Sequence, residues 1–375
     1  MQALAQATGS AAIASLTGDR LLGERAALNG FRIPGRRSAG GQCQLLAARG
    51  GWVALNLARD SDRDLLPALF GTTMIDTSDL GEIAELTFAS DSLEMVMRGR
   101  EMGLALAASN EVPDSCAARS VLFAGTPAPP PQKAPLVVDL SSLWSGPLCG
   151  DLLRLAGAHV IKVESRQRPD AMRDGDPAFF NRLNHGKDSL VLDLPGSEGA
   201  AELNRLIGQA DIVIEASRPR ALAHMGIDAE AHIARSPGKT WITITGHGAS
   251  DDRASWIGFG DDCGVAGGLS QALHEATGSM GFVGDAIADP LSGLTAARAA
   301  WDHWSGGTGG RIGIGMSGVV AMAIADERAA DAIRFDHDLK AWAAAAGRPF
   351  PALDLPPPSE AARPLGADNQ TWLSC

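Results

Sequence analysis

The sequence predicts an α/β protein with a large domain built on a Rossmann-like parallel sheet and a second, smaller α/β domain. Short apolar runs alternate with amphipathic helical segments between residues 136 and 246, which is typical of a parallel sheet covered on both faces. Five prolines in residues 126–135 interrupt regular structure and indicate a linker. A shorter strand and helix pattern precedes the linker, and 375 residues suffice for two domains of roughly 150 residues each.

Residues 1–125 are expected to form the smaller domain, with an irregular or helical lead-in over residues 1–40. Within it, residues 52–57 are expected to form a strand and residues 62–70 a helix. Residues 91–108 are expected to form a longer amphipathic helix, because Asp91 and Glu94 have the spacing of a capping box.

Residues 136–325 are expected to form the Rossmann-like domain. Its strands are predicted at 136–140, 159–164, 189–194, 211–216 and 240–246, with helices that include 148–156 and 198–210. Sheets of this kind bind ligands at the carboxyl ends of their strands. Residues 326–375 are expected to form a C-terminal helix and an extended, proline-rich tail.

Composition excludes several classes of protein. The chain has 32 Lys+Arg against 44 Asp+Glu, a net charge of −12, which argues against general binding to nucleic acids or to membrane surfaces. No segment approaches the roughly 18 apolar residues of a membrane span, and five dispersed cysteines without a C-x-x-C pair argue against a disulfide framework. A soluble, cytoplasmic protein is therefore expected.

Several kinds of active site lack their motifs. The residues after the first strand of the large domain, SSLWSGPLCG, contain no G-x-G-x-x-G, and the chain has no P-loop and no G-x-S-x-G frame around Ser317. A metal site at Asp261, Asp262 and Cys263 with His247 is disfavoured, because these hard and soft ligands have no spaced partners. Solvated loop carboxylates beside a small buried cysteine are the preferred interpretation, and no metal is expected.

Six segments in order resemble the family III CoA-transferases, the group that includes formyl-CoA transferase, carnitine CoA-transferase and the α-methylacyl-CoA racemases. The resemblance runs from about residue 135 to residue 322. It is carried by VVDLSSLWSGPLCGDLLRLAGAHVIKVE, LNHGKDSLVLDL, DIVIEASRPRALAHMGID, ITGHG, FVGDAIADPLSGLTAA and SGGTGGRIGIGMSGVVAMA. It implies a CoA-transferase that moves CoA between an acyl-CoA and a carboxylic acid.

The resemblance makes Asp289, in GDAIADPLSG, the catalytic nucleophile. Members of the family attack the thioester with an aspartate carboxylate and pass through an aspartyl-CoA thioester. Proximity and oxyanion stabilisation would offset the weak nucleophilicity of a carboxylate. The residues alone also allow a structural interpretation, in which Asp289 and Pro290 start a helix.

The resemblance also implies a set of residues that contact CoA. Most of them follow successive strands, and a ligand such as CoA needs cations and a narrow tunnel at that place. The candidate CoA-binding residues are Leu143, Trp144, Arg166, Lys187, Leu192, Ala216, Ser217, Arg218, His224 and Met225. Three positions depart from the family pattern: Trp144 replaces a glutamine, His224 an arginine and Asp188 another arginine. The substrate is therefore not implied by the resemblance.

The resemblance implies acyl-CoA and a carboxylic acid as substrates, no prosthetic group, and an interlocked homodimer. The smaller domain precedes the large one, whereas in most members it follows, and the glycine-rich loop of formyl-CoA transferase has no counterpart. Phe259 stands where the racemase branch has its catalytic histidine. Two alternatives remain: an acyl-CoA racemase or isomerase, and a non-catalytic subunit that binds CoA esters.

Overall fold

The computed structural model describes residues 1–375 except 114–117, 195, 217–219 and 374–375. Its centre is a seven-stranded sheet in the order β4-β10-β9-β8-β5-β6-β7, in which every pairing is parallel except that of β4 with β10. The strands are β4 (Arg119–Ala124), β5 (Leu136–Asp139), β6 (His159–Ser165), β7 (Asp188–Leu192), β8 (Ile212–Glu215), β9 (Thr240–Thr245) and β10 (Gly310–Gly315). The five predicted parallel strands are confirmed.

The six parallel strands have the Rossmann order 3-2-1-4-5-6, with β5 as the first strand. Their residues are almost all buried, because helices cover both faces of the sheet. The predicted fold class is confirmed. The helices that follow β5 are α7 (Ser145–Leu155), α8 (Met172–Gly175), α9 (Pro177–Asn184), α10 (Ser197–Gln209), α11 (Arg220–His224), α12 (Ala229–Arg235), α13 (Gly260–Ala266), α14 (Leu269–Thr277), α15 (Ala288–Ser305), α16 (Met316–Ala344) and α17 (Asn369–Trp372), and a short helical turn, η3, spans Asp251–Ser255.

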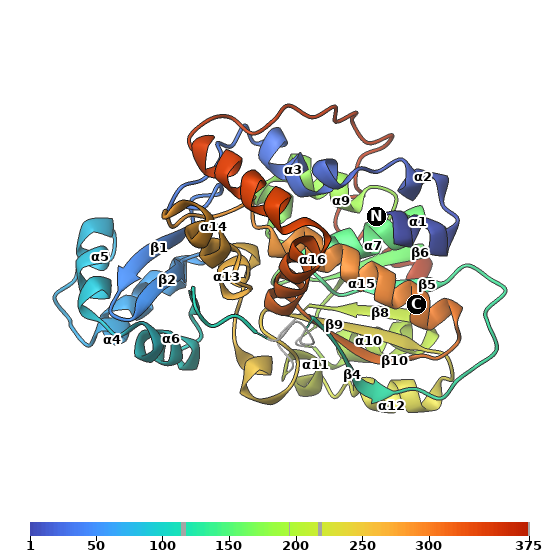
Figure 1. Ribbon diagram of the computed structural model, residues 1–375. Coiled ribbons are helices and arrows are strands. Elements are labelled where there is room, and N and C mark those ends of the chain that lie inside the picture. Colours follow the sequence, from blue (N-terminus) through green and yellow to red (C-terminus); the bar gives the residue numbers. More distant parts are fainter. Residues whose placement is uncertain (114–117, 195, 217–219, 374–375) are drawn as a thin grey trace.

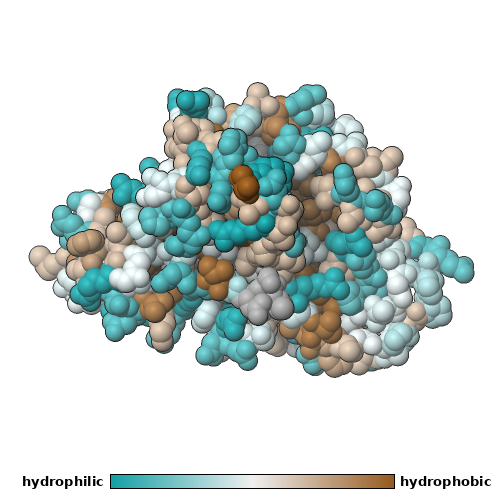
Figure 2. All heavy atoms as spheres, in the orientation of Figure 1, coloured by the Kyte–Doolittle hydropathy of each residue, from teal (hydrophilic) through white to brown (hydrophobic). Residues whose placement is uncertain are grey.

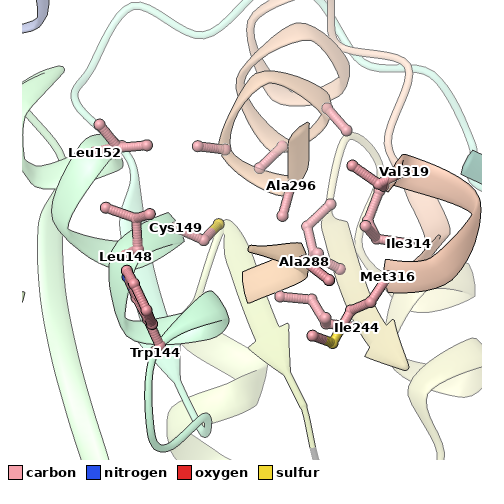
Figure 3. Packing of buried hydrophobic residues seen from close by; sticks show 14 of the residues in the cluster. Trp144, Leu148, Cys149, Leu152, Ile244, Ala288, Ala296, Ile314, Met316 and Val319 are labelled. Atoms are coloured by element: carbon pink, nitrogen blue, oxygen red, sulfur yellow. The ribbon is translucent and has the colours of Figure 1, made fainter. Parts of the chain in front are cut away.

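Two hydrophobic cores lie on opposite faces of this sheet. On one face, α7, α15 and α16 contribute Leu148, Ala296 and Val319 to a single hydrophobic cluster (Figure 3). On the other face α10 and α12 contribute Leu203 and Ile233. Residues 288–300 include six buried small side chains, which lets α15 approach both α7 and the sheet closely.

The smaller domain lies to one side of the large one and is built on an antiparallel sheet (Figure 1). Its strands are β1 (Cys43–Ala48), β2 (Gly51–Asn56) and β3 (Ala105–Ala108), and its helices are η1 (Asp60–Leu65), α4 (Leu66–Phe70), α5 (Leu80–Ala89) and α6 (Ser92–Glu101). The prediction of one helix over 91–108 was wrong in its second half. Asp91 does cap α6, accepting bonds from the amides of Leu93 and Glu94, but the helix ends before Gly103, which has φ +80.

The N-terminal lead-in belongs to the large domain, contrary to the predicted boundary. Its helices α1 (Gln2–Thr8), α2 (Ala11–Ala14) and α3 (Gly18–Leu28) contribute Leu4, Ile13 and Leu21 to the core that contains Val137. Residues 119–124, predicted in the smaller domain, form β4 of the large sheet. The smaller domain is therefore an insertion between two parts of the large one. The buried side chains of the N-terminal helices pack in the core of the large domain, and the sequence pattern of these short helices did not indicate that position.

The C-terminal tail crosses the large domain and ends beside β7. Residues 351–364 contain no helix or strand, as their prolines predict. At the sheet edge, the side chain of Asn369 accepts a bond from the Val191 amide and donates one to the Val191 carbonyl, both at 3.0 Å. Asp368 accepts a bond from the Ser189 amide at 2.8 Å. The tail thus occupies an edge that would otherwise present unpaired backbone groups.

Within the described part of the chain, no helix is both long enough and apolar enough to cross a membrane. On the face seen in Figure 2, hydrophobic residues are scattered among hydrophilic ones.

Candidate active site

A pocket of about 180 Å³ opens at the carboxyl ends of the parallel strands. It lies beside the point where the strand order reverses, between β5 and β8, which is where ligands bind in sheets of this kind. The described lining residues come from the ends of β5, β8, β9 and β10, from the first turn of α7, from the segment before α13 and from α15: Ser142, Leu143, Ser145, Gly146, Ala216, Ile244, Thr245, Gly246, Ala254, Trp256, Ile257, Gly258, Phe259, Asp289 and Met316.

Asp289 is the one charged side chain among the described lining residues of this pocket. It is the second residue of α15 and its side chain caps no amide of that helix, so it is not the structural cap that the residues alone allowed. The carboxylate approaches α13 closely: a Cβ added to Gly260 would lie 2.3 Å from Asp289 Oδ2 and 2.3 Å from the Ala286 carbonyl oxygen. Glycine at position 260 is therefore needed for this arrangement.

Burial raises the pKa of Asp289 to about 7, and three neighbouring carboxyl groups raise it in the same direction. These neighbours are Asp261, Asp262 and Asp285. Arg25 opposes the rise. The Asp289 side chain remains partly exposed, because it opens on the pocket. A carboxyl group with a pKa near neutrality can change its protonation state at the pH at which a cell works.

Arg25, from α3, is the main cation of this acidic cluster. Its Nη1 lies 3.0 Å from Asp285 Oδ1, and its guanidinium stacks over the rings of Phe31 and Trp144 at 5.5 and 5.4 Å. Burial raises the pKa of Asp285 to about 7, with Arg25 opposing. No sequence pattern indicated Arg25, because α3 joins the site only through tertiary packing.

The first turn of α7 faces the pocket through Ser145 and Gly146. The amides of a first helical turn lack partners within the helix and favour negative charge. Leu143, just before it, adopts the left-handed conformation with φ 68, and its amide donates to Asp170 Oδ1 at 3.2 Å. Ser145 Oγ is buried and has no hydrogen-bond partner.

The predicted CoA contacts are placed in different ways. Leu143 and Ala216 line the pocket together with Asp289, which the sequence had grouped only through the resemblance. Arg166 and His224 are exposed, outside the lining of the pocket. Ser217 and Arg218 lie outside the described residues.

Of the remaining predicted contacts, Trp144, Leu192 and Lys187 are buried and Met225 is half-buried. Trp144 is 3% exposed and meets Phe179 edge to face at 4.9 Å, so its indole packs in the core beside the pocket. Leu192 is buried at the end of β7, and Met225 packs against the second core.

Lys187 requires a correction, because its ammonium group is fully committed inside the protein. Its Nζ contacts Asp139 Oδ2 at 3.0 Å, the Pro147 carbonyl at 2.8 Å and Asn184 Oδ1 at 3.0 Å. Three bonds use all three donors of a lysine. Lys187 therefore fixes the strand end beneath α7 and does not reach a phosphate in this structure.

The interpretation of Asp261 and Asp262 as solvated loop carboxylates was also wrong. Both lie in the first turn of α13, and Asp262 is fully buried. Asp261 Oδ1 accepts a bond from the Ala286 amide at 3.0 Å, and Asp262 Oδ1 accepts one from Asn56 of the smaller domain at 2.7 Å. These carboxyl groups join α13 to the loop before α15 and to the smaller domain.

Comparison with known proteins gives a consistent family. The model of CoA-transferase family III matches residues 135–340. The chain is 30% identical over 215 residues to a succinate–glutarate CoA-transferase of Agrobacterium fabrum, covering 53% of this chain and 54% of that protein. It is 31% identical over 198 residues to a succinyl-CoA–D-citramalate CoA-transferase of Chloroflexus aurantiacus, covering 50% and 49%. The chain thus spans about half the length of these relatives.

A solved structure of a CAIB/BAIF family protein from Brucella suis is also similar. It is 28% identical with a TM-score of 0.48, and the match covers 56% of this chain and 58% of that one.

Proposed function

Because the chain belongs to CoA-transferase family III, we propose that it transfers CoA between an acyl-CoA and a carboxylic acid, with Asp289 as the nucleophile. One observation carries the proposal: the Asp289 carboxyl group opens on the pocket at the carboxyl ends of the strands. A carboxylate held beside a thioester gains reactivity from proximity. The first turn of α7 supplies amides, and Ser145 a free hydroxyl, that would stabilise the oxyanion.

The proposed reaction has four displacements. Asp289 attacks the thioester carbonyl and expels CoA thiolate, which gives a mixed anhydride. The thiolate attacks the aspartyl carbonyl, releases the first carboxylate and forms the aspartyl-CoA thioester. The acceptor carboxylate then attacks this thioester, expels CoA thiolate and forms a second anhydride. Attack of the thiolate on the new acyl group gives the product acyl-CoA and regenerates Asp289.

The pocket favours a small acyl group without a second charge. Its described walls include Ile244, Trp256, Ile257 and Met316, its volume is about 180 Å³, and the acids around Asp289 would repel a distal carboxylate. Short monocarboxylic acyl-CoA esters are therefore the first donors to test. A thermal-shift series across acyl length and charge would rank them by differential stabilisation.

Trapping of the intermediate tests the proposal. Incubation with an acyl-CoA and then hydroxylamine should convert Asp289 to a hydroxamate, which peptide mass spectrometry would locate. Full activity in Asp289→Ala would overturn the mechanism. Exchange of the substrate α-hydrogen with deuterium, without acyl transfer, would indicate a racemase or isomerase. Stabilisation by CoA esters with no modification and no turnover would indicate a binding subunit.

A further inference from the structure

Behind the wall of the pocket, the fold brings together three side chains that can bind a metal ion. These are His247, just after β9, and Asp262 and Cys263, in the first half of α13. One ligand atom from each lies within 4.8 Å of the other two, and all three residues are buried. The sequence disfavoured a metal site at these residues because their spacing is irregular, whereas the folded chain brings the three ligand atoms together.

His247 has a free ligand atom in the protein interior. The residue is 5% exposed, and its Nε2 is buried without a hydrogen-bond partner. An imidazole nitrogen without another partner can serve as a metal ligand.

Asp262 and Cys263 are oriented toward the same point. Asp262 Oδ1 is held by Asn56 Nδ2 at 2.7 Å and by the Phe259 amide at 3.0 Å. Asp262 Oδ2 lies 3.9 Å from Cys263 Sγ, and Cys263 Sγ lies 3.3 Å from the Gly246 carbonyl oxygen. In metal sites, hydrogen bonds to the carboxylate oxygen that does not bind the metal orient the ligating carboxylate.

We propose that His247 Nε2, a carboxylate oxygen of Asp262 and Cys263 Sγ bind one zinc ion. Zinc accepts nitrogen, oxygen and sulfur ligands, and tetrahedral bonds of about 2.0–2.3 Å place ligand atoms about 3.3–3.7 Å apart. Ligand atoms within 4.8 Å reach that geometry by small side-chain movements. On binding, the Cys263 thiol releases its proton to solvent. The two anionic ligands then balance the charge of the ion.

The surroundings of the three ligands fit this assignment. A Cβ added to Gly258 would lie 2.5 Å from Cys263 Sγ and 3.1 Å from His247 Nε2, so glycine keeps the space beside both ligands open. The nearby cation Arg100 is neutralised by Glu111, with contacts of 2.8 and 2.6 Å. Because Gly246 and Gly258 also line the pocket, the ion would lie directly behind the wall.

Metal content of the tag-free full chain tests the proposal. Protein expressed in zinc-supplemented medium and dialysed extensively should retain about one zinc ion per chain by elemental analysis. Cys263→Ala and His247→Gln should each reduce this to background. Cys149→Ala is the matched control, because Cys149 is equally buried but lies in α7, outside the three ligands. Cys149→Ala should keep the zinc.

Cobalt provides a second readout that does not depend on the variants folding. Wild-type chain expressed with cobalt should show the near-ultraviolet absorption of a thiolate bound to cobalt. Zinc at background in the wild type, retention of zinc in Cys263→Ala, or bound cobalt without this absorption would each overturn the site. None of these results depends on the proposed transferase activity, so the two proposals fail separately.

Discussion

The parts of the chain before and after residue 135 contribute to the site in different ways. The later part, which the family model matches, supplies the pocket, Asp289 and the first turn of α7. The earlier part supplies Arg25, which pairs with Asp285, and Asn56, which bonds Asp262. The matched part therefore carries the proposed reacting groups, and the unmatched part contacts the acids around them.

Removal of the proposed nucleophile is expected to have the largest effect. Asp289→Asn should reduce acyl transfer roughly 10³-fold or more, because the amide cannot attack the thioester. Steady-state kinetics with the best donor would measure this. Asp302→Asn is the control, because Asp302 lies in the same helix but pairs with Arg298 near the surface. Comparable activity in the two variants would remove Asp289 from the reaction.

The contact between α13 and α15 should be the next most sensitive feature. In Gly260→Ala the new methyl group would lie 2.3 Å from both Asp289 Oδ2 and the Ala286 carbonyl. Overpacking of this kind costs about 1–3 kcal/mol, and displacement of the carboxylate should reduce the rate roughly 10–100-fold. Chemical denaturation and single-turnover kinetics would measure the two effects.

A glycine with open space provides the control for this substitution. Gly208, in α10, has nothing within 4 Å of its added Cβ, so Gly208→Ala should leave the rate unchanged and stabilise the helix slightly. If Gly260→Ala behaved like Gly208→Ala, the close approach of Asp289 to α13 would be wrong.

The division of the chain at residue 135 also explains which features the sequence could predict. The alternating apolar runs determine the parallel strands, and the strand order places Leu143, Ala216 and the end of β9 at one edge, where a pocket is expected. Asp289 could be identified from the sequence because it lies in a contiguous motif. Arg25 was not, because α3 has no periodic feature that specifies its partner. The burial of Lys187 and Asp262 was equally hidden, since charged residues are ordinarily exposed.

The pH dependence of the reaction should reveal the contribution of the unmatched part. Attack needs the Asp289 carboxylate, so the rate of acyl-enzyme formation should rise with pH through about 7, the pKa that burial gives this group. Arg25 opposes that rise in pKa, and Arg25→Gln should move the midpoint upward by roughly one unit. The variant should be slower at pH 6 and close to wild type at pH 9.

Arg25→Lys separates this electrostatic role from a packing role. The lysine keeps the positive charge beside Asp285 but loses the planar stack over Phe31 and Trp144. Its midpoint should therefore stay near that of the wild type even if the variant is less stable. An unchanged pH–rate profile in Arg25→Gln would show that the positive charge of Arg25 does not act on Asp289.

The smallest effect is expected at the C-terminal tail, the other part of the chain beyond the family match. Asn369→Ala removes two hydrogen bonds to the Val191 backbone, worth about 1–2 kcal/mol together. Because β7 is at the sheet edge and β6 separates it from β5, the rate should not change. Release of the tail should instead raise its cleavage by a protease up to roughly tenfold. Gln370→Ala, an exposed neighbour, is the control. Equal protease resistance in both variants would mean that other contacts, such as the bonds of Asp368 to Ser189 and of Trp372 to Asp188, hold the tail against the sheet.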